Sequence, residues 1–477
     1  MAQVLSLAQQ QVIARVRREG HDYVLRWLDE LSESERDILL EQLYLLDFAR
    51  VREVAALLAA GPKPPPLEDV APAPVTRLPR SDEERDAQAR TAALGAQALR
   101  DDRVAALTVA GGQGTRFNYK PPKGIYPITP VLRKSFFQVH AEKILAARHR
   151  YGCRIPWLIM VSPFNEPETR GFFEQHAYFG LGAQSVHFFA QPVNVILGAD
   201  GRILMEVKCQ ALMGPDGHGG VFEALARTSI LPELQEDGFD LISYFQVDNP
   251  LVTVADERFL GHHLAGQAEF SCKVIPKRDP WERLGVAVLR GGRPGIIEYS
   301  HLPDAMAAER LPSGELNYLY GSIAIHIMDV VFGRRVAEQR LSLPWHIARR
   351  QYDIVDDQGQ QVKSDPKGCY KFERFVFDCM PYAERCAFVE VDRADEFAPV
   401  KTQEGADSPP TARAMMRAQW LRWLREAGAD VTALEGPSAE LEIGPLFATS
   451  AEELRERIPA GWRPVPPVVL DEPVARG

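Results

Sequence analysis

The sequence predicts an α/β fold: a mixed sheet flanked by helices, with a helical N-terminal segment and a small C-terminal domain. From residue 104 onward, short apolar runs of strand length alternate with longer amphipathic segments. That alternation is typical of parallel strands joined by helical crossovers. A glycine-rich turn follows the first of these runs, at residues 111–114. A chain of 477 residues has room for two to four domains of about 150 residues each.

Residues 1–60 are expected to be helical, because apolar side chains recur there at helical spacing. Ser32 and Glu35 have the spacing of a capping box, which predicts that a helix begins at this point. Residues 61–79 hold seven prolines in nineteen positions, too many for a helix or a central strand. We therefore expect residues 61–82 to form a semi-rigid linker or an extended strap over the surface.

Four apolar runs are the expected parallel strands of the main sheet, with helical segments between them. The expected strands are 104–110, 157–162, 186–190 and 241–247, and the expected helices include 136–150 and 166–179. Sheets of this kind bind ligands beyond the carboxyl ends of their strands, where the strand order switches. Gly111 and Asp248 each follow such an end.

The region that follows is predicted to be β-rich and antiparallel, because its short apolar runs are joined by polar or glycine-rich turns. The expected strands are 271–275, 285–289 and 295–299, with 318–328 and 370–378 returning to the main sheet.

An amphipathic helix is expected over residues 411–427, after a polar loop. Its apolar face carries Met416, Trp420, Trp423 and Leu424, which we interpret as core packing. The expected domains are a helical segment 1–60, a linker 61–82, a catalytic domain 100–385 and a C-terminal domain 386–477 that includes the loop of Lys401.

The turn after residue 110 has the composition of a polyphosphate-binding loop. Its glycines are Gly111, Gly112 and Gly114. Glycines leave backbone N–H groups uncovered, which suits close approach to phosphate oxygens. Arg116 and Lys123 add two cations within one loop length. We interpret the string as a nucleotide site, the alternative being a surface turn with incidental basic residues.

Two common phosphate motifs do not match this loop. The P-loop requires Gly-Lys-Ser/Thr after four intervening residues, and no such string is present here. The dinucleotide fingerprint requires a third glycine, but Phe117 stands at that position.

Asp248 is the candidate metal ligand, at the end of the apolar run 244–247. Mg²⁺ is typically held by one or two carboxylates, with phosphates and waters completing its octahedron. The alternative is a turn cap, since Asp-Asn-Pro is also a good turn string. The nearby phosphate loop favours the metal role, and a second acid such as Glu223 is left open.

A second glycine cluster, residues 215–220, precedes a helix expected at 221–228. Gly217 can bring backbone against a flat base, and His218 can reach a sugar hydroxyl or a phosphate. Gln191 ends a strand, where its amide can read a uracil edge. The alternatives are a loop that merely needs positive φ, an exposed histidine and a structural glutamine.

These strings occur in the order seen in the eukaryotic-type UDP-N-acetylhexosamine pyrophosphorylases, which the chain resembles over most of its length. The matching strings are 110–124, 215–220, 247–249, 297–300, 372–378 and 395–401. The resemblance implies a Rossmann-like (GT-A type) nucleotidyltransferase fold within the UDP-sugar pyrophosphorylase family. The helical N-terminal segment is also similar to theirs.

The resemblance also implies roles for individual residues. Arg116, Lys123 and Lys401 would be catalytic cations on substrate phosphates, although a lone lysine such as Lys401 is more often simply exposed. Asp248 would hold Mg²⁺. The implied substrate-binding residues are Gly111, Gly112, Gly114, Gln191, Gly217, His218, Asn249, Glu298 and Ser322.

Two positions depart from the N-acetylhexosamine pattern. His218 stands where that branch generally has asparagine, and Ser322 replaces the asparagine of a Gly-Asn-Ile string. Both lie in the expected sugar pocket. The expected reaction is UTP plus N-acetylglucosamine 1-phosphate, giving UDP-N-acetylglucosamine and pyrophosphate. UDP-glucose or UDP-galactose formation is one alternative, and a non-catalytic UDP-sugar sensor is another.

Composition bounds the partners. The chain carries 55 Lys and Arg against 65 Asp and Glu, a net charge of −10, which argues against a general nucleic-acid surface. Its six scattered cysteines include no Cys-x-x-Cys pair, so zinc and a disulfide framework are poorly supported. Without a signal segment or a spanning apolar stretch, we expect a cytoplasmic protein with no membrane partner, and homo-oligomerisation is left open.

Overall fold

The computed structural model describes residues 5–61, 67–112, 119–339, 341, 343–436 and 438–471. The chain forms two compact units. The first unit comprises Met1–Pro66, Gln191–Val221 and Ser342–Asp378, and the second comprises Leu67–Ala190, Phe222–Leu341 and Cys379–Gly477. The domain boundaries expected from the sequence stay a prediction.

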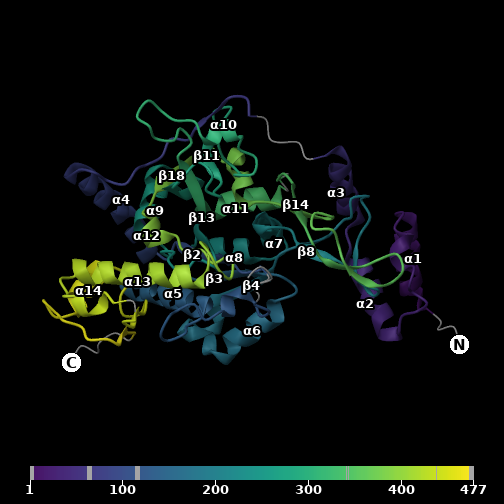
Figure 1. The fold of residues 1–477 in the computed structure, drawn as a ribbon, viewed down its shortest axis with the longest axis horizontal. Coiled ribbons are helices and arrows are strands. Elements are labelled where there is room, and N and C mark those ends of the chain that lie inside the picture. The colour runs from purple at the N-terminus through teal and green to yellow at the C-terminus, as the bar shows by residue number, and fades with distance from the viewer. Residues whose placement is uncertain are drawn as a thin grey trace. The chain divides into compact units, whose positions relative to one another are not determined.

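A mixed sheet lies at the centre of the second unit (Figure 1). Its strands, within the described residues, are β1 (Val70–Pro72), β2 (Val104–Val109), β3 (Trp157–Val161), β4 (Val186–Ala190), β9 (Leu241–Gln246), β10 (Phe270–Pro276), β11 (Val286–Arg290), β12 (Arg293–Ile297), β13 (Tyr320–Asp329) and β18 (Cys386–Glu390). The main path runs β1-β11-β13-β9-β2-β3-β4, with β12 beside β11, and with β10 between β13 and β18. The predicted α/β class with a mixed sheet is confirmed.

The four expected parallel strands are confirmed as β2, β3, β4 and β9. Val109 of β2 pairs with Met160 of β3 and with Gln246 of β9, so these three strands end at the same edge. Every residue of β2 is buried, as expected for a parallel strand covered on both faces. Gly111 and Asp248 therefore emerge at one edge of the sheet.

Helices accompany this sheet. Those in the described part of the second unit are α4 (Asp82–Arg100), α5 (Phe136–Tyr151), α6 (Glu166–Gln175), α7 (Val221–Ala226, which begins at the boundary), α8 (Ile230–Glu236), α9 (Glu257–Ala265), α10 (Asp304–Ala307), α11 (Val330–Glu338), α12 (Arg393–Glu396), α13 (Pro409–Glu426) and α14 (Ala451–Arg457). Helices α4 and α9 lie side by side (Figure 1). A Cβ on Gly95 would lie 2.0 Å from the carbonyl oxygen of Glu257, so this close approach requires glycine.

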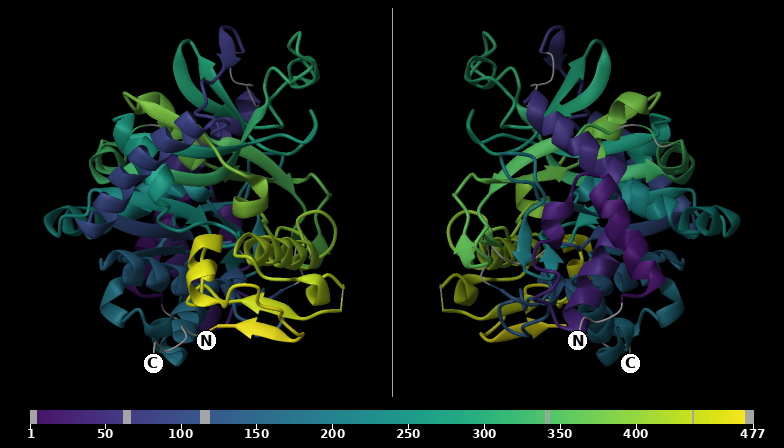
Figure 2. Two further views of the ribbon diagram at one scale, coloured as in Figure 1. Left: turned by 90° about the vertical axis from the view of Figure 1, so that its left-hand side faces the viewer. Right: turned by 90° about the vertical axis from the view of Figure 1, so that its right-hand side faces the viewer.

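The C-terminal residues form a small layer of their own within the second unit. Helix α13 packs beside α14 and beside β19 (Leu441–Ile443), which pairs in parallel with β20 (Val468–Leu470) (Figure 2). Met416, Trp420 and Leu424 are buried in the hydrophobic core. The prediction that this helical face packs into the core is confirmed.

The described part of the proline-rich segment is extended and bound to the sheet. Strand β1 pairs antiparallel with β11, which places Pro72 on an edge strand, where proline is tolerated. Further along, the Thr76 N–H donates to the carbonyl of Phe388, and its carbonyl accepts from Glu390. Residues 67–79 thus match the strap that was one of the two expectations.

The first unit contains the N-terminal helices and four small two-stranded sheets in its described residues. These elements are α1 (Leu7–Arg18), α2 (Glu33–Leu45), α3 (Phe48–Ala60) and the pairs β5 (Val193–Val195) with β8 (Met213–Pro215), β6 (Met205–Val207) with β7 (Gln210–Ala211), β14 (His346–Arg350) with β17 (Cys369–Glu373), and β15 (Asp353–Val355) with β16 (Gln361–Lys363). The capping box is confirmed: Ser32 Oγ accepts from the Glu35 N–H, and the Glu35 carboxylate accepts from the Ser32 N–H.

Two strand predictions have opposite outcomes. The return of 318–328 to the main sheet is confirmed by β13. The return of 370–378 is wrong, because β17 pairs with β14 and the chain then enters a 3₁₀ helix, Val376–Tyr382. The physical reason is packing: Phe372 and Tyr370 of this run share a hydrophobic core with Ile347 of β14, and that core belongs to the first unit. No helix in the described part of the chain is long and apolar enough to span a lipid bilayer.

Candidate active site

The glycine-rich turn expected to bind phosphate starts directly after the carboxyl end of β2. The preceding carbonyl, that of Ala110, accepts a 3.0 Å hydrogen bond from the side-chain amide of Asn165. Gly111 is buried, whereas Gly112 is exposed and a Cβ there would meet no described atom within 4 Å. Gly112 thus presents bare backbone at the carboxyl edge of the parallel strands. We call this the ligand edge, because sheets of this kind bind ligands there. Gly114 and Arg116 lie outside the described residues.

The structure brings Lys123, Asp248 and Lys401 together, although they are far apart in sequence. Nζ of Lys123 lies 2.7 Å from Oδ2 of Asp248, and Nζ of Lys401 lies 3.9 Å from the same oxygen. The Lys123 and Asp248 side chains are 15% and 10% exposed, whereas that of Lys401 is 51% exposed. One buried carboxylate is therefore shared by two ammonium groups, one of which reaches solvent.

Local structure holds Lys123 in this position. Lys123 begins a short 3₁₀ turn, Lys123–Ile125, which the Tyr126 N–H closes on the Lys123 carbonyl. A Cβ on Gly124 would lie 2.2 Å from the ring of Phe137, so the Pro-Lys-Gly string needs its glycine. The backbone that carries Lys123 is therefore packed tightly against α5.

Asp248 is held by backbone contacts on either side. His140 Nε2 lies 2.9 Å from the carbonyl of Val247, and burial lowers the pKa of His140 to about 3, so the ring is neutral and donates. The Asp248 carbonyl accepts a 3.0 Å bond from Val400, next to Lys401. A direct backbone bond thus joins the segment after β9, which carries the carboxylate, to the loop that carries the second lysine.

The charges of the cluster favour an ionised carboxylate. Burial by itself raises the pKa of Asp248, but the Lys123 and Lys401 ammonium groups outweigh it, and the pKa is held below its ordinary value. The loop of Lys401 is closed by its own N–H, which donates a 2.7 Å bond to the carbonyl of Asp407. Burial raises the pKa of the Asp407 side chain.

The donor set at Asp248 fits Mg²⁺ held mainly by phosphates. Over the described ranges, no group of three or more His, Cys, Asp or Glu side chains is placed to hold a metal. A single ionised carboxylate suits Mg²⁺, because Mg²⁺ is typically held by one or two carboxylates together with substrate phosphates and waters. Glu223, the other acid considered, pairs with Arg227, the residue that follows the end of α7.

Both polar atoms of the Asn249 side-chain amide form hydrogen bonds with backbone groups. Its Nδ2 donates a 2.7 Å bond to the carbonyl of Glu396, and its Oδ1 accepts from the N–H of Ala398 at 3.0 Å. Asn249 thereby fastens the segment after Asp248 to the segment before Lys401. Its expected contact with substrate stays a prediction.

Glu298 and Ser322 flank the same residue, Gly285. A Cβ on Gly285 would lie 3.5 Å from Glu298 Oε1, and the Ser322 N–H donates to the Gly285 carbonyl at 2.8 Å. Ser322 Oγ lies 3.2 Å from Sγ of Cys272. The two residues expected to contact the sugar are therefore neighbours in the second unit.

The direction of β13 puts Ser322 toward the ligand edge. Strand β13 runs antiparallel to β9, with His326 opposite Tyr244. Residues of β13 before His326, including Ser322, therefore lie toward the carboxyl end of β9, the end that Asp248 follows.

The first unit contains the residues expected to contact the uracil base. Gln191 is buried directly after β4. Gly217 has φ of +86°, and a Cβ there would lie 2.5 Å from the carbonyl oxygen of Arg374. His218 Nδ1 accepts from the Val376 N–H at 3.0 Å, and its ring stacks on Phe375. Gly217 is therefore required by the fold itself, and uracil recognition by Gln191 and Gly217 stays a prediction.

Sequence reasoning missed a buried charge network beside this site. Lys273, in the middle of β10, is fully buried and ion-paired with Asp256 and Glu396. The available signal was a lysine inside the apolar run 270–275, where a charge must find a buried partner.

Three comparisons with known proteins bear on the site. A family model described as UTP--glucose-1-phosphate uridylyltransferase matches residues 67–408. The Homo sapiens UDP-N-acetylhexosamine pyrophosphorylase-like protein 1 is 34% identical, over 98% of each chain. The Arabidopsis thaliana UDP-N-acetylglucosamine diphosphorylase 2 is 32% identical, over 93% of this chain and 91% of the relative. The solved Trypanosoma brucei uridine diphosphate N-acetylglucosamine pyrophosphorylase, in complex with an inhibitor, aligns with a TM-score of 0.78 and 29% identity, over 96% of this chain and 95% of that chain.

Proposed function

The chain belongs to the UTP--glucose-1-phosphate uridylyltransferase family, and from that membership we propose that it makes UDP-N-acetylglucosamine and pyrophosphate from UTP and N-acetylglucosamine 1-phosphate. The uridylyltransferase activity follows from membership of this family. The choice of sugar is supported by relatives named for UDP-N-acetylhexosamine and UDP-N-acetylglucosamine that align along nearly the whole chain. The cluster of Lys123, Asp248 and Lys401 beside Gly111 and Gly112 is the observation that carries the chemistry.

The reaction needs cations more than it needs a base. An oxygen of the sugar phosphate attacks the α-phosphorus of UTP in line, the bond from the α-phosphorus to the bridging oxygen breaks, and pyrophosphate leaves. The nucleophile is already an anion, so no proton has to be removed. The barrier arises because two polyanions meet while charge moves to the leaving group, and positioned cations lower it.

Lys123 and Lys401 are the two cations within the described residues that we assign to the substrate phosphates. Asp248 keeps the Lys123 ammonium oriented at the ligand edge before substrate arrives, so little reorganisation is needed when phosphate oxygens replace part of its contact. Lys401 is half exposed and can follow a phosphate into the site. Arg116, from the same loop as the glycines, is proposed as a third cation.

Asp248 is also the proposed protein ligand of Mg²⁺. When bound, the ion would neutralise charge on the UTP phosphates. The carboxylate is ionised and lies at the carboxyl edge of the sheet, and both properties suit this role. Gly111 and Gly112 would offer backbone N–H groups to the same phosphates.

Two observations favour a different sugar phosphate as the substrate. His218 and Ser322 depart from the N-acetylhexosamine pattern, and Ser322 is neighbour to Glu298, the proposed sugar contact. A shorter side chain at Ser322 leaves a sugar hydroxyl to be contacted through water. UDP-glucose or UDP-galactose formation is therefore the second candidate function.

The deciding experiment measures pyrophosphate release from UTP with each of three sugar phosphates. N-acetylglucosamine 1-phosphate should give the highest kcat/KM, above glucose 1-phosphate and galactose 1-phosphate. A higher kcat/KM with either hexose phosphate would replace the first candidate by the second. UTP binding without pyrophosphate release from any of the three would instead support a sensor.

A further inference from the structure

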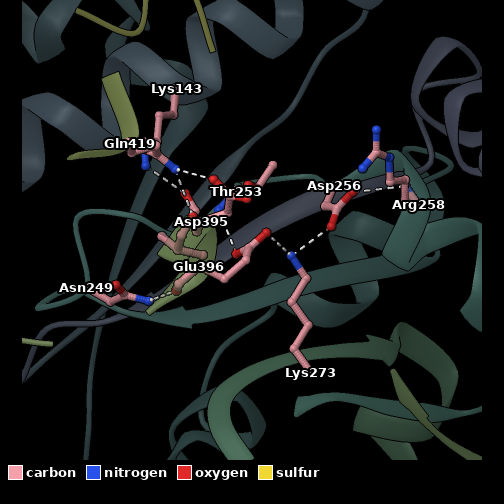
Figure 3. Close-up of polar contacts among 10 residues, drawn as sticks. Lys143, Asn249, Thr253, Asp256, Arg258, Lys273, Asp395, Glu396 and Gln419 are labelled. Atoms are coloured by element: carbon pink, nitrogen blue, oxygen red, sulfur yellow. Dashed lines mark hydrogen bonds and ion pairs between the residues drawn. The ribbon is translucent and has the colours of Figure 1, made fainter. Parts of the chain in front are cut away.

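A buried network of three charges lies next to the cluster of Lys123, Asp248 and Lys401. Nζ of Lys273 lies 2.7 Å from Oδ2 of Asp256 and 2.7 Å from Oε1 of Glu396 (Figure 3). The Lys273 side chain is fully buried, and those of Asp256 and Glu396 are 15% and 7% exposed. None of the three is in the proposed catalytic machinery.

The network joins three separate segments of the second unit. Lys273 belongs to β10, Asp256 lies just before α9, and Glu396 is the last residue of α12. Glu396 Oε2 also accepts a 3.1 Å bond from the N–H of Thr253. One glutamate thus holds the chain after Asp248 to the chain before Lys401.

Further hydrogen bonds link this network to the cluster of Lys123, Asp248 and Lys401. The Glu396 carbonyl accepts from Asn249, and Asn249 accepts from Ala398 (Figure 3 draws the first of these). Asp248 then accepts from the N–H of Val400 at 3.0 Å. Asn249 follows Asp248 directly and Val400 precedes Lys401 directly, so every bond in the series bridges the same two segments.

The two segments have both apolar packing and an adjoining cavity. Val252 and Val400 are fully buried in the hydrophobic core. Residues 250–258 and 395–396 line a cavity of about 500 Å³, which α13 and the C-terminal residues border from the other side. Because a cavity adjoins these segments, packing constrains them less tightly there, and the polar contacts add a directional restraint.

The charges of the network are suited to this task. Burial lowers the pKa of Lys273, but the two carboxylates outweigh it and hold the pKa above its ordinary value, so the lysine stays charged. A buried ion pair often stabilises a fold no more than apolar residues of the same volume would. Its directional bonds can instead select one geometry.

We propose that Lys273, Asp256 and Glu396 form a positioning clamp that holds Lys401 within reach of Asp248. The proposal rests on the proposed function for its catalytic consequence. Its structural content, a fixed contact between the two segments, stands independently of which sugar is used.

The test compares two glutamates in matched surroundings. Glu396 and Glu142 are both buried, each pairs with a buried lysine, and each of those lysines has an aspartate as second partner. Glu396→Gln should lower kcat about tenfold with KM for UTP nearly unchanged, since small misplacements of a catalytic group reduce rate steeply. Glu142→Gln should leave kcat within about twofold of wild type.

Two further readouts separate positioning from general damage. Hydrogen exchange should rise in a peptide covering 397–401 of Glu396→Gln and stay unchanged in one covering β3. In a Lys401→Ala background, Glu396→Gln should lower kcat by less than about twofold, because the group it positions is gone. If Glu396→Gln fails to fold, the triple variant Lys273→Met/Asp256→Asn/Glu396→Gln removes all three charges together and provides the same readouts.

The outcomes distinguish the clamp from the activity. Unchanged exchange at 397–401, or an undiminished kcat effect in the Lys401→Ala background, would overturn the clamp. A wild-type chain without pyrophosphate release would overturn the proposed function, and the exchange measurement would still decide whether the clamp exists.

Discussion

Replacing Lys123 or Lys401 by methionine should separate two consequences that usually occur together, loss of activity and loss of stability. Both lysines face the same carboxylate oxygen, at 2.7 Å and 3.9 Å. Lys123 is mostly buried, whereas Lys401 is half exposed. Methionine keeps most of the length of either side chain and removes its charge.

The expected stability changes follow from distance and burial. At 2.7 Å and an effective dielectric constant near 20, the Lys123–Asp248 attraction is about 6 kcal/mol, part of which offsets desolvation. We therefore expect Lys123→Met to lower the free energy of unfolding by about 3 kcal/mol. At 3.9 Å and half exposed, Lys401 contributes at most about 1 kcal/mol, and Lys401→Met should be nearly neutral.

The expected activity changes are alike for the two variants. Each removes one of the cations proposed to contact the phosphates, and removal of such a group typically lowers kcat about 100- to 1,000-fold. Urea unfolding followed by circular dichroism gives the stabilities, and pyrophosphate release at saturating UTP gives kcat. Equal stability losses in the two variants, or a Lys401→Met enzyme with near wild-type kcat, would refute the reasoning.

Three other predictions test separate parts of the structure. Gly217→Ala should destabilise the chain by about 1–3 kcal/mol, because its φ is +86° and a Cβ would meet the Arg374 carbonyl. Gly112→Ala, whose Cβ would meet no described atom within 4 Å, should raise KM for UTP without changing the unfolding midpoint, and the reverse pattern would contradict both assignments. Asp248→Asn should require more Mg²⁺ for any remaining activity, and EDTA should abolish wild-type activity until Mg²⁺ is restored. The difference in free energy of unfolding between wild type and this variant should narrow as pH falls below 3.8, because the pKa of Asp248 in the folded chain lies below that value. Burial lowers the pKa of Lys143 from 10.5 to about 7, so between those pH values the unfolded chain binds more protons than the folded chain. The free energy of unfolding of wild type should therefore rise relative to that of Lys143→Met by up to about 1.4 kcal/mol per pH unit as pH increases. A pH-independent difference in urea unfolding would contradict this.

The sequence predicted the parallel half of the sheet closely because its signal is local. The run 186–190 is β4 residue for residue, and β2, β3 and β9 differ from expectation by one residue at their ends. Apolar runs bounded by polar turns depend on neighbours along the chain. The partner of 370–378 was not local, since several strands were available to it, and there the prediction was wrong.

The site shows the same division. Lys123 and Asp248 were identified from strings of a few residues, since a glycine-rich turn and a strand-end carboxylate are each visible in sequence. Lys401 was identified through resemblance, because a lone lysine carries no local signal. Lys273, Asp256 and Glu396 were missed, since each is an ordinary charged residue until the fold brings the three together.

Taken alone, the order of residues in this chain determined which segments become the parallel strands, where a glycine-rich turn follows a strand, and which chemistry the cations suit. Tertiary structure decided which charges share a carboxylate, how deeply each is buried, and which bonds hold Lys401 near Asp248. The reason is physical: strand and turn preferences act between near neighbours, whereas Coulomb energy and desolvation depend on distances in space that only the folded chain fixes.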